Sequence, residues 1–142
     1  MSETYEGRCY CGAVVLEVQG PPVEMGYCHC QACRAYSGAP VNAYTLWPTD
    51  AVRVREGAEY LHSFSKTGMN ERVACGKCGG LLMVRLPAFG LIDIFAGVLP
   101  TLPFKPTVHV NYESTVLPMK DGLPKYKDFP ADGGGSGALM AE

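Results

Sequence analysis

Hydrophobic and polar residues alternate along much of the chain with a period of two rather than 3.6. Residues 52–55 read Val-Arg-Val-Arg, and residues 14–19 place Val, Leu and Val on one face. Such alternation is typical of half-buried β-strands. The pattern predicts strands over residues 14–19, 41–46, 52–55, 60–64, 71–74, 81–86, 91–98 and 107–113.

Glycine and proline residues lie between these predicted strands. The chain has 17 Gly and 11 Pro, and turn signals such as Gly20-Pro21-Pro22 and Pro48-Thr49-Asp50 separate the predicted strands. Long helices have little room, and the only helical turn predicted covers residues 31–36. Many short strands between turns favour an all-β fold with little helix.

The length of 142 residues fits one domain, and 47% hydrophobic residues can build a real core. We predict a single domain over residues 1–130. Residues 131–142 contain Gly-Gly-Gly-Ser-Gly at 133–137, which predicts a disordered tail.

Charge narrows the possible partners. Charged residues make up 18% of the chain and the net charge is -2, so the basic surplus of a nucleic-acid binder is missing. No apolar run approaches the roughly 18 residues that span a bilayer, and the start of the chain has no apolar signal region. Seven thiols without a secretory signal predict a reducing cytoplasm.

All seven cysteines lie in three tight clusters, Cys9-Tyr10-Cys11, Cys28-His29-Cys30-Gln31-Ala32-Cys33 and Cys75-Gly76-Lys77-Cys78. Cysteines one or two residues apart can direct two sulfurs at one ion, as zinc sites require. The odd count and narrow spacing disfavour a disulfide framework. Division of the seven cysteines into four and three suggests a closed four-thiolate site and a three-thiolate site. The second site would keep an open coordination position, which is the feature of a catalytic zinc.

Two groupings of the clusters satisfy this arithmetic. In the first, one zinc joins Cys9, Cys11, Cys75 and Cys78, and a second takes Cys28, Cys30 and Cys33. In the second, a zinc ribbon uses Cys30, Cys33, Cys75 and Cys78. Spacing alone does not decide between these two groupings. It is also compatible with the interpretation that every zinc is structural.

Other polar residues near the clusters have weaker signals. His29 lies between two ligands, so we predict that its ring points away from their metal, while His62 and His109 are predicted to be packed or hydrogen-bonded. Arg34 follows the last cysteine of the middle cluster. It is either a surface residue that offsets thiolate charge or a bidentate clamp for a substrate carboxylate. Alternative cations for that clamp are Lys66, Arg72 and Lys105.

Cys-x-Cys-Gly at 9–12, Cys-His-Cys-x-x-Cys-Arg at 28–34 and Cys-Gly-x-Cys-Gly at 75–79, in this order, resemble the glutathione-dependent formaldehyde-activating enzyme family, which includes the centromere protein V domain. His109 and the Asp-Gly-Leu-Pro stretch at 121–124 match more weakly. The resemblance covers roughly residues 7–126. It implies a zinc-bound β-tent of packed antiparallel sheets.

The resemblance also implies a structural zinc on the first and third clusters and a second zinc on Cys28, Cys30 and Cys33. The family's founding activity condenses glutathione with formaldehyde to S-hydroxymethylglutathione, as a carbon-sulfur lyase. We therefore expect a zinc-dependent enzyme that joins a small thiol, with glutathione as possible co-substrate, to an aldehyde, with Arg34 contacting the thiol substrate. The alternative is a zinc-stabilised binding module without chemistry, for a protein or small-molecule partner.

Overall fold

A computed structural model describes residues 3–142, which divide into two compact units. Unit 1 comprises the described residues up to Glu24 and Thr45–Phe104, and unit 2 comprises Met25–Tyr44 and Lys105–Glu142. Each unit is built from two separate stretches of chain. As a result the first and third cysteine clusters belong to unit 1, and the middle cluster belongs to unit 2. That residues 1–130 form a single domain stays a prediction.

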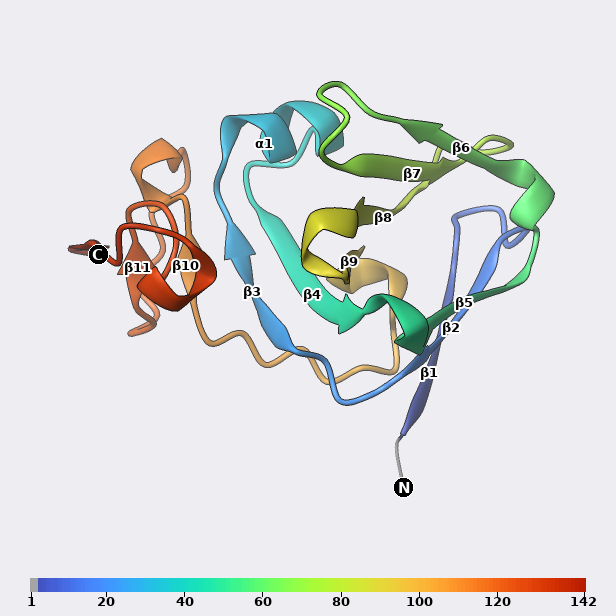
Figure 1. The fold of residues 1–142 in the computed structure, drawn as a ribbon, viewed down its shortest axis with the longest axis horizontal. Coiled ribbons are helices and arrows are strands. Elements are labelled where there is room, and N and C mark those ends of the chain that lie inside the picture. The colour runs from blue at the N-terminus through green and yellow to red at the C-terminus, as the bar shows by residue number, and fades with distance from the viewer. Residues whose placement is uncertain (1–2) are drawn as a thin grey trace. The chain divides into compact units, whose positions relative to one another are not determined.

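Strands dominate the chain (Figure 1), which confirms the expected all-β fold. The strands are β1 Thr4–Arg8, β2 Val15–Gln19, β3 Glu24–Cys28, β4 Asn42–Pro48, β5 Val52–Glu56, β6 Leu61–Phe64, β7 Glu71–Cys75, β8 Leu81–Leu86, β9 Leu91–Phe95, β10 His109–Val110, β11 Lys125–Tyr126 and β12 Leu139–Met140. Within residues 3–142 the one α-helix is α1, Gln31–Ser37. Single 3-10 turns are η1 Thr49–Ala51, η2 Ala58–Tyr60, η3 Pro87–Phe89, η4 Ala96–Val98, η5 Tyr112–Ser114 and η6 Ala131–Gly133. No helix of the described chain is long and apolar enough to cross a membrane.

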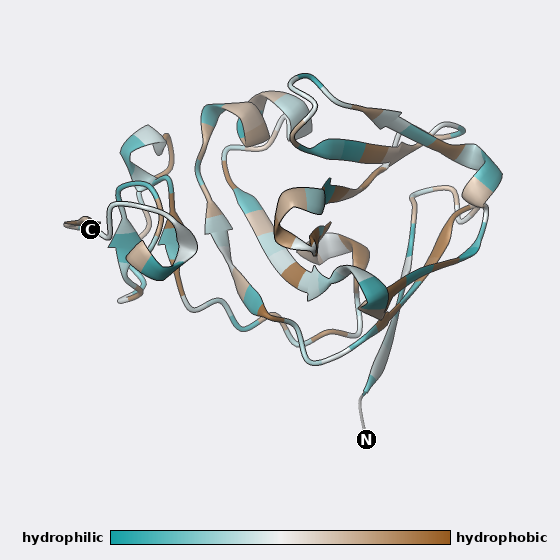
Figure 2. Cartoon of the chain, in the orientation of Figure 1, coloured by the Kyte–Doolittle hydropathy of each residue, from teal (hydrophilic) through white to brown (hydrophobic). Residues whose placement is uncertain are grey.

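In unit 1 the strands pair antiparallel in two groups, β1-β2-β5 and β9-β8-β7-β6. Hydrophobic and hydrophilic segments are mixed along these strands (Figure 2). The hydrophobic side chains form the buried core, which includes Val14, Val15, Leu16, Val18, Trp47, Val73, Leu82 and Ile94. Burial of each large apolar side chain contributes roughly 1.5 to 3 kcal/mol. The indole of Trp47 donates to Thr45 Oγ1 at 2.8 Å, so its polar atom is also satisfied.

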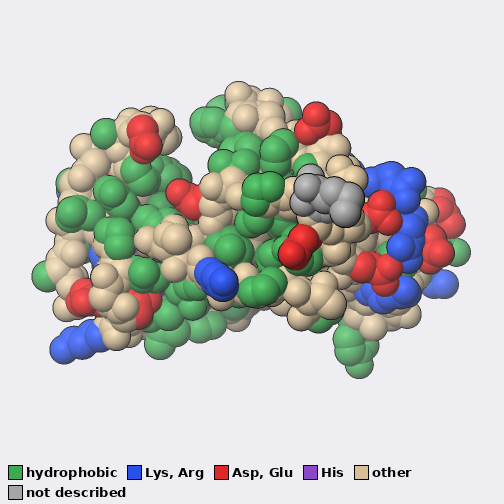
Figure 3. Space-filling model, turned by 90° about the horizontal axis from the view of Figure 1, so that it is seen from below, with side chains coloured by type: hydrophobic (Ala, Val, Ile, Leu, Met, Phe, Trp, Pro, Cys, Tyr) green, Lys and Arg blue, Asp and Glu red, His purple; other side chains and the backbone are tan. Residues whose placement is uncertain are grey.

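Charged side chains occupy the solvent face of β1, β2 and β5, where basic and acidic groups intersperse on the right of Figure 3. Glu6 pairs with Arg8 at 2.9 Å and with Arg55 at 2.7 Å, while Glu17 pairs with Arg53 at 3.3 Å. Exposed pairs of this kind contribute little stability. Their value is to keep one face of the sheet hydrated while the other is buried.

Unit 2 carries a mixed sheet, whereas the resemblance implies antiparallel sheets. The strand order is β12-β11-β10-β3, followed by the first residues of β4. The pair β11–β12 is antiparallel, but β10 runs parallel to both β3 and β11. A parallel pair needs a long connection, and the long stretch of chain between β3 and β10 supplies one. Gly26 lets β3 lie close to the residue that precedes β10, because a Cβ at position 26 would lie 2.6 Å from the Val108 carbonyl oxygen.

The segments 14–19, 41–46, 52–55, 60–64, 71–74 and 81–86 form strands as predicted, and α1 lies where the helical turn was expected. Two predicted strands are shorter than expected, since β9 ends at Phe95 and β10 spans only His109–Val110. Sequence reasoning missed β1, β3, β11 and β12. These strands are short or polar, and their partners rather than an alternating pattern hold them extended.

The sequence predicts disorder for residues 131–142, but the structure gives this segment defined contacts. Leu139 and Met140 form β12, which pairs with β11. The Asp128 carboxylate accepts hydrogen bonds from the backbone and the hydroxyl of Ser136, at 3.0 and 2.8 Å. Glycine-rich composition therefore marks a turn here, and the residues that follow it return to the sheet.

Candidate metal centres and their buried polar support

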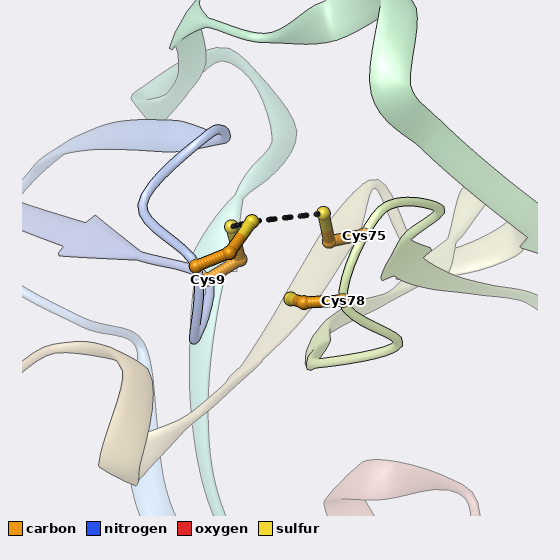
Figure 4. A group of neighbouring side chains, drawn as sticks. Cys9, Cys75 and Cys78 are labelled. Atoms are coloured by element: carbon orange, nitrogen blue, oxygen red, sulfur yellow. Dashed lines mark hydrogen bonds between the residues drawn. The ribbon is translucent and has the colours of Figure 1, made fainter.

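Four cysteine sulfurs converge in unit 1. Cys9 and Cys11 follow β1, while Cys75 ends β7 and Cys78 lies in the turn before β8; Figure 4 shows Cys9 facing that turn. The Cys9–Cys11 sulfurs are 3.6 Å apart, the Cys11–Cys75 sulfurs are 3.9 Å apart, and all four lie within 4.8 Å of one another. Tetrahedral zinc with bonds of about 2.3 Å places its sulfurs roughly 3.8 Å apart. The four sulfurs therefore fit one zinc ion.

Backbone N–H groups donate to three of these sulfurs. The bonds run from Val14 N to Cys9 Sγ at 3.2 Å, from Lys77 N to Cys75 Sγ at 3.4 Å and from Gly80 N to Cys78 Sγ at 3.3 Å. The Gly80 bond, followed by one from the Cys11 backbone, lowers the pKa of Cys78 to about 6. Donors of this kind favour the thiolate, which is the form that binds metal.

Three further sulfurs converge in unit 2, at the junction of β3 and α1. Cys28 ends β3, Cys30 is the N-cap of α1, and Cys33 lies in its first turn. The Cys28–Cys33 sulfurs are 3.8 Å apart, and all three lie within 4.8 Å of one another. Among residues 3–142 no fourth cysteine, histidine or carboxylate joins this group. The three thiols crowd one another, and hydrogen bonding to Cys30 is the main cause that raises the pKa of Cys28 to about 11.

The structure thus brings the first and third clusters together and leaves the middle cluster by itself. Neither sulfur group contains the set of Cys30, Cys33, Cys75 and Cys78 that the zinc-ribbon grouping needs. All seven cysteines are free thiols. That the two groups hold zinc stays a prediction, which the sulfur spacing and the thiolate donor sets support.

His29 is fully buried, and both of its ring nitrogens have partners other than sulfur. Nδ1 lies 2.9 Å from Thr115 Oγ1, and Nε2 lies 2.8 Å from His109 Nδ1. The ring is therefore engaged away from the cysteines on either side of it, as expected. His109 is also buried and hydrogen-bonded, as predicted, whereas His62 is exposed on β6, where a packed or hydrogen-bonded histidine was expected.

The partners of the two histidines determine where their protons lie. His109 Nε2 is 2.7 Å from Asp121 Oδ2, and an ionised carboxylate can only accept, so Nε2 carries the proton. In the neutral pair, His109 Nδ1 then accepts from His29 Nε2. His29 Nδ1 in turn accepts from the Thr115 hydroxyl. The result is one directed hydrogen-bond chain from Thr115 to Asp121.

The hydrogen-bond chain continues into an ion cluster around the buried Lys125, whose side chain is 1% exposed. Its ammonium group donates to Asp121, to Glu142 Oε2 at 2.6 Å and to the Leu123 carbonyl at 3.0 Å. Glu142 Oε2 also accepts from the Asp121 and Gly122 amides, at 2.8 and 2.9 Å. Burial opposes ionisation of Asp121, but hydrogen bonds from Lys125 and His109 outweigh it and hold the pKa of that carboxyl well below its usual range.

Sequence reasoning missed the support role of Thr115, Lys125 and Glu142. The four-residue spacing of Asp121 and Lys125 was not a usable signal, because it brings side chains together on a helix and residues 121–125 are not helical. No local pattern predicts that Glu142 reaches Lys125, because seventeen residues separate them in the chain.

Arg34 lies on α1, one residue beyond Cys33, and its Nε donates to the His29 carbonyl at 3.1 Å. Within residues 3–142 no carboxylate forms an ion pair with it. It borders an open depression of about 470 Å³ lined by Gln31, Arg34, Ala35, Gly38, Ala39, Pro40 and Val116. Of the alternative cations, Lys66 and Arg72 belong to unit 1 and Lys105 is an exposed residue of unit 2. The substrate role of Arg34 stays a prediction.

The chain is similar to known proteins in sequence and in fold. A protein of Schizosaccharomyces pombe described as an uncharacterized lyase is 28% identical over 78 residues, which is 55% of this chain. The match also covers 55% of that protein, so the chain spans about half the length of this curated relative. A crystal structure of a Rhodobacter sphaeroides protein matches with a TM-score of 0.54 and 25% identity, covering 69% of this chain and 90% of that one.

The sequence profile described as glutathione-dependent formaldehyde-activating enzyme matches residues 4–114. The match covers all seven cysteines, so it includes both sulfur groups that the fold assembles. The matched segment is more than half of the chain and contains all three cysteine clusters. This chain therefore belongs to the glutathione-dependent formaldehyde-activating enzyme family.

Proposed function

We propose that the chain is a zinc-dependent carbon-sulfur lyase that condenses a small thiol, such as glutathione, with formaldehyde or another small aldehyde. The observation that carries the proposal is the group of Cys28, Cys30 and Cys33, which has no fourth ligand among the described residues. The family and the lyase named among its relatives support the same reaction class. In this proposal Cys9, Cys11, Cys75 and Cys78 hold a structural zinc.

The chemistry is an addition without any redox change. One carbon-sulfur bond forms, the carbonyl π bond breaks, and the thiol proton ends on the former carbonyl oxygen. A zinc ion bound by the three cysteines would supply the substrate thiol in its deprotonated form. The role of the protein is to hold that thiol beside the centre and to bind the rest of the molecule.

In this proposal, Arg34 binds a carboxylate of the thiol substrate. The helix that carries Cys33 also carries Arg34, and the bond from Nε to the His29 carbonyl holds the guanidinium in position. The depression beside it is lined mainly by small and apolar residues such as Ala35, Ala39 and Val116. A guanidinium at the border of a weakly polar surface suits an anionic group with a short aliphatic body, which describes a carboxylate-bearing thiol.

Arg34→Ala should weaken glutathione binding. A lost charged hydrogen bond to a carboxylate costs on the order of 1.5 to 3 kcal/mol, so the dissociation constant should rise roughly ten- to a hundredfold. Calorimetric titration measures the constant, and exchange NMR of formaldehyde and glutathione measures turnover above the uncatalysed background. Arg34→Lys is the matched control, since it keeps the charge but loses the planar fork. No glutathione binding at millimolar concentration would favour the binding-module alternative.

The two centres should differ in how firmly they hold metal. We expect purified, reduced protein to contain between one and two zinc ions per chain, with the three-cysteine centre incompletely filled. Three thiolates bind zinc less tightly than four, and their open position permits oxidation or loss. Elemental analysis before and after mild chelation measures this. Two zinc ions that both survive chelation would indicate that both centres are structural.

A further inference from the structure

Asn111 has an unusual backbone conformation. Among residues 3–142 it is the one non-glycine residue with positive φ, at 53°. The left-handed region is unfavourable for L-residues, although asparagine tolerates it better than most. Glycine would adopt the conformation freely. The backbone conformation therefore does not explain the asparagine, and its side-chain contacts are the next feature to consider.

The side-chain amide of Asn111 reaches the three-cysteine centre, because Nδ2 lies 3.4 Å from Cys28 Sγ. An amide nitrogen can only donate, so the sulfur is the acceptor. Cys28 is the most buried cysteine of this centre, with 9% exposure. A donor aimed at a buried sulfur stabilises its thiolate form, in which the sulfur binds metal.

The backbone around Asn111 is held on both sides. Val110 pairs with Cys28 in the parallel β3–β10 register, which places Asn111 one residue beyond this ligand. Its backbone N–H donates to the Asp128 carbonyl at 2.7 Å, and its carbonyl accepts from Ser114 N at 3.1 Å. With the main chain fixed at these points, the left-handed turn directs the amide at Cys28.

We propose that Asn111 is a positioning residue of the three-cysteine centre, which orients Cys28 and adjusts its strength as a metal ligand through an N–H···S hydrogen bond. The proposal rests on metal binding at this centre, as in the proposed function. Residues that orient metal ligands typically change metal affinity or activity 10- to 100-fold when replaced. The backbone strain at Asn111 is consistent with such a role, since strained residues persist where their surroundings require them.

The test uses the full chain with both centres intact and two substitutions at this position. Asn111→Gly removes the amide but suits positive φ, and Asn111→Asp keeps the shape while turning an oxygen toward sulfur. Zinc affinity of the weaker centre is measured by competition with a chromophoric chelator. We expect it to fall roughly 10- to 100-fold in Asn111→Gly and further in Asn111→Asp. Asn70→Gly, in unit 1, is the matched control and should leave this affinity unchanged.

A spectroscopic measurement separates this role from a purely structural one. With cobalt in place of zinc, loss of a hydrogen bond to the Cys28 thiolate should shift the sulfur-to-metal charge-transfer band to lower energy. The thermal midpoint of Asn111→Gly should change little, since relief of strain offsets the lost bond. Wild-type affinity and an unshifted band in Asn111→Gly would overturn the proposal, as would failure of the wild-type centre to bind metal. Metal binding without thiol-aldehyde turnover would instead overturn the proposed function alone.

Discussion

Cys75→Ser should leave the chain largely unfolded, whereas Cys30→Ser should remain folded and lose only metal. Cys75 is 1% exposed, and its group joins the loop after β1 to the β7–β8 turn. A structural zinc contributes on the order of 10 to 16 kcal/mol of folding free energy, and whole domains are stable by roughly 5 to 15 kcal/mol. Loss of that ion therefore removes about as much free energy as the fold has. Circular dichroism and thermal unfolding measure the outcome.

Cys30→Ser is a matched control because serine can preserve the local structure. Cys30 is the N-cap of α1, and its Sγ accepts from Cys33 N at 3.2 Å. Serine is a favoured N-cap residue, so α1 should keep its first turn. The variant should hold about one zinc ion per chain. Equal thermal midpoints for the two variants would contradict the assignment of the four-cysteine group as the structural one.

Lys125→Met should destabilise the chain by roughly 2 to 3 kcal/mol, because it leaves Asp121 and Glu142 without their shared cation. Removal of one partner from a fully buried ion pair costs roughly 3 to 5 kcal/mol. The estimate here is lower because the two carboxylate side chains are 29% and 37% exposed. Methionine resembles the lysine side chain without its terminal nitrogen and can fill most of the same space. Denaturant unfolding near pH 7 measures the change in unfolding free energy.

Lys127→Met is the control, since Lys127 is exposed and lies only two residues away; it should change stability by less than about 0.5 kcal/mol.

The pH dependence of stability is a second readout. Lys125 is the main cause that lowers the pKa of Glu142, and it also lowers that of Asp121 against the opposing effect of burial. The folded-state pKa values of Glu142 and Asp121 lie below the ordinary 4.5 and 3.8. As the pH falls, these carboxylates therefore take up protons in the unfolded chain before they do so in the folded one. Wild-type stability should fall as the pH drops below about 5, and Lys125→Met should show a flatter decline. Parallel curves would argue that Lys125 does not act through these carboxylates.

Local pattern was sufficient for the parts of the fold that depend on neighbouring residues. Period-two alternation placed strands such as β5 and β8 correctly, because burying one face of a strand requires that pattern. The cysteine spacing identified candidate metal ligands, since chelation by two nearby sulfurs is also a local property. The helical turn predicted over residues 31–36 is also present, as α1.

Contacts between distant segments required the tertiary structure. Spacing alone allowed two groupings of the cysteines, and only the fold shows that the sulfurs of Cys9 and Cys11 lie within 4.8 Å of those of Cys75 and Cys78. Equally, no sequence pattern links Asn111 to Cys28 or Glu142 to Lys125. Each of these contacts depends on strand pairings between segments far apart in the chain, and such pairings form only when the whole fold compensates the entropy of closing the loops between them.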